Sequence, residues 1–136
     1  MTGVQTCALP ISRGDEKDAR AAYDRAVSLA DPTARFIVHL RRSEFRLATR
    51  SPEEAAADAV QALAAAQKDV EPGARSSRVG LANLALARAL RDQGKSADAR
   101  AAAAVAIEHL EPTVGVDHAD TRAARALAGV AGESPG

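Results

Sequence analysis

The feature that most constrains this chain is a motif that returns at a fixed interval. An acidic residue followed by proline occurs three times, forty residues apart each time, at Asp31-Pro32, Glu71-Pro72 and Glu111-Pro112. Ahead of each motif, alanines recur seven positions apart, in the pairs Ala19 and Ala26, Ala55 and Ala62, and Ala99 and Ala106. Positions seven apart lie two turns apart on one helix face, so these small side chains let a neighbouring helix approach closely. The period predicts an all-α fold of stacked units.

Three segments with broader apolar faces alternate with the alanine-rich stretches, at 32–50, 73–94 and 116–131. Pro32 suits the first turn of a helix, and Gly94 suits a helix C-terminus. Asp117, Asp120 or Thr121 could cap the third segment. Together with the alanine-rich stretches, these segments predict six helices in about three hairpins.

The composition favours helices and excludes several classes of protein. Alanine makes up about a quarter of the chain, aromatic residues 2 %, and there are 15 arginines against 3 lysines, which fits strong helix propensity and a GC-rich bacterial genome. The 136 residues suffice for one domain, and the formal net charge is zero, so no global field attracts nucleic acid or a membrane. No run of 18 apolar residues exists, and a secretory signal or transit peptide is not evident. We therefore expect a cytoplasmic protein.

The segment that starts at Leu81 and ends at Pro112 contains small and apolar residues at characteristic positions of two successive helices: Leu86, Ala87, Leu90, Gly94, Ala99, Ala106 and Pro112. With these residues, the segment resembles a tetratricopeptide repeat. The stretch that follows is similar to the start of another unit of the bacterial kinesin-light-chain-like variety. Over residues 13–131, the resemblance implies a right-handed superhelical array of antiparallel helix hairpins, an α-solenoid. The middle unit departs from the pattern, because Arg50 or Ser51 stands where the turn glycine belongs and its alanines align only with steps of 36 and 44 residues.

A closed helical bundle is the alternative to this array. A bundle would bring residues near 20 against residues near 120, whereas repeats contact only their sequence neighbours.

Residues 1–12 differ in character from the rest of the chain. They contain the only cysteine, Cys7, and show no helical period; residues 1–11 resemble a translated sequencing adapter. We expect 1–12 to be an artefactual or poorly ordered leader and 132–136 to be a disordered tail. The helix from about 15 to 30 would then lack a hairpin partner, which leaves Tyr23, Val27 and Leu29 partly uncovered.

No catalytic or cofactor-binding pattern occurs. There is no glycine-rich phosphate loop, no pair of histidines at metal-binding spacing and no nucleophile signature. His39, His109 and His118 lie in three different segments, and the acidic residues around His118 fit a helix entry better than a metal site. The sequence predicts a protein without enzymatic activity, cofactor or metal.

One local charge feature stands out on segment 32–50. At 100° per residue a basic stripe falls within an arc of about 80°, with Arg41 apart from it; the stripe consists of Arg35, His39, Arg42, Arg46 and Arg50. The stripe is either a solvated face or part of a binding groove. The resemblance implies that first helices line a groove, where Arg88 also falls, while Asn83 belongs to the packing face. A basic groove favours an acidic peptide or a C-terminal carboxylate.

We expect a non-catalytic interaction scaffold, part of a larger bacterial regulatory or signalling protein, with Arg35, His39, Arg42, Arg46 and Arg88 contacting a partner peptide. The alternative is the regulatory C-terminal repeat region of an enzyme such as a bacterial serine/threonine kinase. Nucleic-acid binding through the stripe is a weaker possibility, because aromatic platforms for stacking bases are missing.

Overall fold

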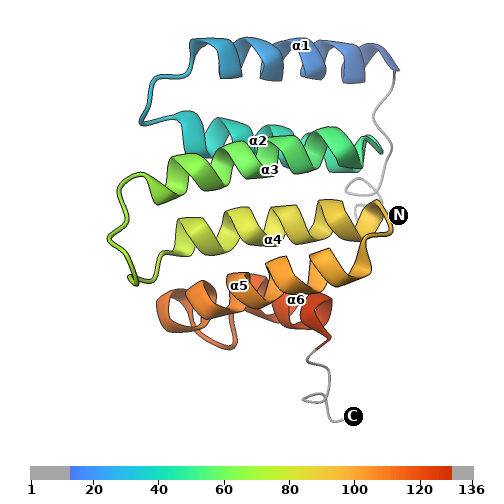
Figure 1. The fold of residues 1–136 in the computed structure, drawn as a ribbon. Helices are drawn as coiled ribbons and strands as arrows, with labels where there is room; N and C mark the ends of the chain where they lie inside the picture. Colours follow the sequence, from blue (N-terminus) through green and yellow to red (C-terminus); the bar gives the residue numbers. More distant parts are fainter. Residues whose placement is uncertain (1–12, 130–136) are drawn as a thin grey trace, which may run out of the picture.

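The computed structural model describes residues 13–129, and this part of the chain is helical without strands. Its helices are α1 (Arg13–Leu29), α2 (Arg35–Ala48), α3 (Pro52–Gln67), α4 (Ser77–Asp92), α5 (Ser96–Val114) and α6 (Ala119–Ala128) (Figure 1). The expected leader (1–12), the expected tail (132–136) and the last two residues of the expected repeat domain lie outside the described residues. The prediction of an all-α fold with six helices is confirmed for 13–129.

The helices form an array in which each contacts its neighbours along the chain (Figure 1). α2 also contacts α4, and α4 contacts α6, so these three make one continuous row. α1 contacts only α2, and among the described helices α1, α3 and α5 do not contact one another. The first and last described helices are therefore separate, as the repeat array predicts and the closed bundle does not.

Alanine-rich faces of α3 and α5 let these helices pack closely against their neighbours. Ala55, Ala62, Ala99 and Ala106 are each at most 3 % exposed. Around them, Phe36 and Leu40 of α2 pack against α3 and α4, while Leu84 of α4 packs against Leu110 of α5 and against α6. The packing is so close that a Cβ at Gly80 would lie 2.7 Å from the side chain of Leu110. Small residues at helical spacing therefore set the distance between helices.

The turn between α2 and α3 and the turn between α4 and α5 have the same geometry. Gly94 has φ 82° and Arg50 has φ 64°, the only positive φ of a non-glycine residue in the described chain. In both turns the next residue donates its backbone N–H five positions back, from Lys95 to Leu90 and from Ser51 to Arg46. This is the Schellman pattern of a helix C-terminus. Arg50 thus occupies the position of the missing turn glycine, forty-four residues before Gly94.

Three helix boundaries differ from the sequence-based expectation. Pro32 lies in a turn before α2, which begins at Arg35, because Asp31 accepts the N–H groups of Ala34 and Arg35. Pro112 lies inside α5, which continues to Val114; the proline has no N–H to donate, and the hydroxyl of Thr113 donates to the carbonyl of His109 in the same turn. The cap of α6 is His118, whose Nδ1 accepts the N–H of Asp120; the expected Asp117, Asp120 and Thr121 do not have this role.

The expected exposure of α1 is confirmed. No residue of α1 is buried, and Leu29 is 73 % exposed. Tyr23 and Val27 are partly buried, and the Tyr23 ring lies 5.0 Å from that of Phe45 in α2. α1 is accordingly held by a few contacts with a single neighbour.

Candidate functional site

A groove runs between α2 and α4 and reaches α6. It consists of two adjoining hollows of about 270 and 320 Å³. Its apolar floor and wall are Phe36, Ile37, Leu40, Leu47, Leu81, Leu84 and Ala85, and its polar side chains are Arg41, Ser43, Glu44, Arg88, Arg91 and Asp120. Arg88, Glu44 and Ala85 line both hollows, so they lie where the hollows meet. We refer to this surface as the α2–α4 groove.

The polar side chains of the α2–α4 groove differ in whether they have partners. Arg41 forms an ion pair with Glu44 at 3.0 Å, and Arg91 forms one with Asp92 at 3.1 Å. Arg88 is partly buried and makes no hydrogen bond or ion pair with any other described residue. A cation that is partly shielded from water and unpaired attracts a negatively charged group.

Most of the predicted basic stripe faces neither solvent nor this groove. His39, Arg42 and Arg46 converge on Asp58 of α3, whose side chain is 1 % exposed. His39 Nδ1 lies 2.9 Å from Asp58 Oδ1, and Arg46 Nη1 donates to Asp58 Oδ2 at 2.8 Å. An ionised carboxylate only accepts hydrogen bonds, so His39 Nδ1 carries the proton in this pair. These four residues are the Asp58 cluster.

The Asp58 cluster also joins α1 to the array. Arg42 donates from Nε and Nη2 to Asp58 and from Nη1 to Asp24 of α1 at 2.9 Å. Burial lowers the pKa of Arg42, but the hydrogen bonds and charges of Asp58 and Asp24 outweigh it and raise that pKa above its ordinary value. Arg42 is therefore a permanent positive charge that connects three helices.

The remaining predicted residues lie apart from the Asp58 cluster. Arg35, the first residue of α2, is exposed and lines a separate cleft of about 390 Å³ with residues of α3 and α4. Arg50 is exposed in the turn after α2. Asn83 is buried and donates to the carbonyl of Val79, on the packing face where it was expected. Of the five predicted peptide-contacting residues, only Arg88 lies in the α2–α4 groove; peptide contact by any of the five stays a prediction.

Sequence reasoning missed the groove residues on α2. Ile37, which is 41 % exposed, and Arg41 both line the groove. The sequence pattern gave Ile37 no role in binding and set Arg41 apart from the basic stripe. Their separation from the stripe was itself the signal, because residues outside the arc that faces α3 must face the other way, toward α4. Asp58 also left a trace, since it is the only acidic residue within the alanine-rich run after Glu54 and shares the helix face of Ala55 and Ala62.

Between residues 13 and 129, no group of three or more histidine, cysteine or acidic side chains could hold a metal ion. Over the same range, every helix is too short or too polar to cross a bilayer. Comparison with protein-family models, curated proteins and solved structures finds no match. Function has to be argued from the α2–α4 groove itself.

Proposed function

We propose that the chain is a non-catalytic scaffold of the tetratricopeptide kind, which binds an extended segment of a partner protein in the α2–α4 groove. The observation that carries the proposal is Arg88, a partly buried cation that has no partner among residues 13–129 and lies where the two hollows of the groove meet. In the resemblance to tetratricopeptide repeats, α2, α4 and α6 are the first helices of their units, which line the binding surface.

The groove sets requirements for the ligand. A carboxylate beside Arg88 would gain a charge-assisted hydrogen bond, which is worth about 1.5–3 kcal/mol. Ile37 and Leu81, on opposite walls, offer apolar contacts to the neighbouring side chains of the same peptide. Arg41 and Arg91 already have acidic partners within the chain and contribute less to selection. The best ligand is a short peptide with one acidic group flanked by apolar residues.

The proposal is tested by selecting peptides from a random display library against the whole chain and measuring their affinities by calorimetry. We expect enriched peptides to carry an acidic residue next to apolar ones. Arg88→Glu should lower the affinity for these peptides by about ten- to a hundredfold. Val60→Asp is the matched control, because Val60 is an exposed residue of α3 that does not line the groove.

A charge reversal sharpens this test. Peptides in which the acidic residue is replaced by lysine should bind Arg88→Glu better than the unchanged chain. Selected peptides that bind Arg88→Glu and Ile37→Asp as well as they bind the unchanged chain would place the binding surface elsewhere.

A further inference from the structure

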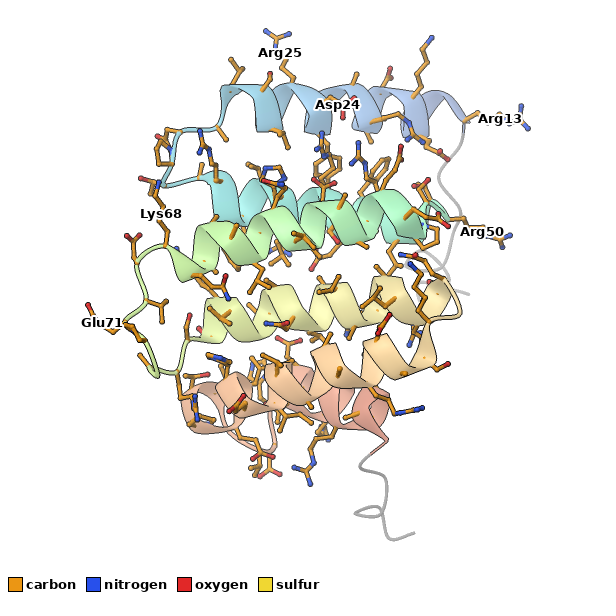
Figure 2. The ribbon with its side chains drawn as sticks, viewed as in Figure 1. Arg13, Asp24, Arg25, Arg50, Lys68 and Glu71 are labelled. Atoms are coloured by element: carbon orange, nitrogen blue, oxygen red, sulfur yellow. The ribbon has the colours of Figure 1, made fainter. Side chains whose placement is uncertain are left out.

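A second cleft lies along one edge of the array, where α2 begins, α3 ends and α4 begins. It encloses about 390 Å³ and is distinct from the α2–α4 groove, with which it shares only Phe36 as a wall. Each of the three helices contributes one cation to its lining: Arg35 from α2, Lys68 at the end of α3, and Arg78 from α4. Figure 2 shows Lys68 at this end of the molecule. We call it the cationic cleft.

The described residues neutralise the cations of the cationic cleft only in part. Arg35 and Lys68 make no hydrogen bond or ion pair with any described residue. Arg78 stacks its guanidinium 5.3 Å from the centre of the Phe36 ring, which leaves the N–H groups at its edge available. Asp69 is the one carboxylate in the lining, so the three cations leave two positive charges in excess.

Two further features supply hydrogen-bonding groups to the cationic cleft. His39 lines it and is 9 % exposed; its Nδ1–H is held by Asp58, so Nε2 is an acceptor that can accept from a phosphate O–H, and it has no partner among the described residues. At the start of α2, the side chain and the carbonyl of Asp31 both accept the N–H group of Ala34, and the carbonyl also accepts that of Arg35. The N–H group of Phe36, which lines the cationic cleft, has no acceptor among the described residues and lies at the positive end of the helix.

We infer that the cationic cleft binds a small soluble ligand through a phosphate group. A phosphate group carries about −1.5 to −2 charges at neutral pH, which matches the two excess positive charges, and its oxygens suit arginine, lysine and backbone N–H donors together. A single carboxylate would leave one of these charges unpaired. The inference does not depend on the peptide function, because Arg88 and the cationic cleft are separate.

The test is titration of the full chain with inorganic phosphate and pyrophosphate at constant ionic strength, followed by NMR of backbone amides and of the His39 ring. We expect saturable shifts at the Phe36 amide and the His39 ring, both of which line the cleft. Lys68→Gln and Arg35→Gln should each lower the affinity for phosphate at least tenfold. Both variants should remain folded, because neither side chain has a partner among the described residues.

Lys95→Gln, which removes one exposed charge from the α4–α5 turn, is the matched control and should leave phosphate affinity unchanged. Equal weakening by Lys95→Gln, or the same shifts with chloride at equal ionic strength, would show unspecific screening and overturn the inference. Binding to phosphatidic acid vesicles without binding of soluble phosphate would overturn it too.

Discussion

Arg42 donates three hydrogen bonds of 2.9 to 3.1 Å to Asp58, sixteen positions further along the chain. The carboxylate is buried, and it is the common partner of His39, Arg42 and Arg46. Removing one side of a buried ion pair leaves uncompensated charge on the other, so the α2–α3 hairpin depends on Asp58 for its stability.

Asp58→Ala should therefore lower the free energy of unfolding by about 3–5 kcal/mol, measured by urea titration with circular dichroism. Glu54→Ala is the matched control on the same helix, because Glu54 is exposed and lies 3.9 Å from Arg46. An exposed pair of this kind is worth about 0–1 kcal/mol. Equal losses from the two substitutions would contradict a special role for Asp58.

Arg50→Gly should raise the stability of the chain. Arg50 is in the left-handed region at φ 64°, where a side chain costs about 1–2 kcal/mol and glycine does not. Part of the gain is offset because glycine gives the unfolded chain more freedom, so we expect a net rise of about 0.5–1 kcal/mol. Thermal unfolding measures it. The reciprocal Gly94→Arg, at φ 82°, should lower stability; a gain there would show that the two turns are not equivalent.

Gly80→Ala should destabilise the contact between α4 and α5. The added methyl group would lie 2.7 Å from Leu110, which is fully buried and has little room to move. We expect a loss of about 1–3 kcal/mol in urea unfolding, the usual cost of overpacking. Gly14→Ala, with nothing within 4 Å of the new methyl group, should cause no loss. If both substitutions stabilise equally, helix propensity rather than close packing governs Gly80.

The pH dependence of stability should contain a contribution from His109. Burial, together with the positive charge of Arg75, lowers the pKa of His109, although Glu108 acts in the opposite direction. The neutral ring accepts the backbone N–H of Ser76 at 3.0 Å and so ties α5 to the start of α4. Because the unfolded chain binds this proton more readily, the contribution is complete above about pH 6.5 and is lost as the pH falls toward the folded-state pKa.

Urea unfolding between pH 7.5 and 5 should accordingly show a stability difference between the unchanged chain and His109→Gln that narrows as the pH decreases. Arg50→Gly, which removes no group that titrates between pH 7.5 and 5, is the control for general effects of acid, and its stability difference from the unchanged chain should stay constant with pH. A difference that stays constant with pH would contradict the assignment to His109.

The array was predictable from the sequence because the helices pack through small residues that recur at a regular spacing. Ala55, Ala62, Ala99 and Ala106 are on the faces that the seven-residue spacing assigned to them, and Gly94 ends its helix as expected. The turn at Arg50 was harder to predict, because arginine is uncommon in the left-handed region and the neighbouring residues do not indicate that conformation.

The candidate site was predicted only in part, since a single helix does not reveal what packs against it. The arc that contains His39, Arg42 and Arg46 was placed correctly on one face of α2. Whether that face meets water, a ligand or α3 depends on Asp58, which lies on the next helix. Arg88 was predicted through the resemblance to a family, and the groove around it needed the contact between α2 and α4.

The single contact of α1 has a consequence for local opening. α1 touches only α2, whereas α4 is flanked by α2, α3, α5 and α6. Detaching α1 breaks the ring contact of Tyr23 with Phe45 and the ion pairs of Asp24, and leaves every other interface intact. Amide protons of α1 should therefore exchange with solvent through a low-energy opening, while those in the middle of α4 exchange only when the whole array comes apart.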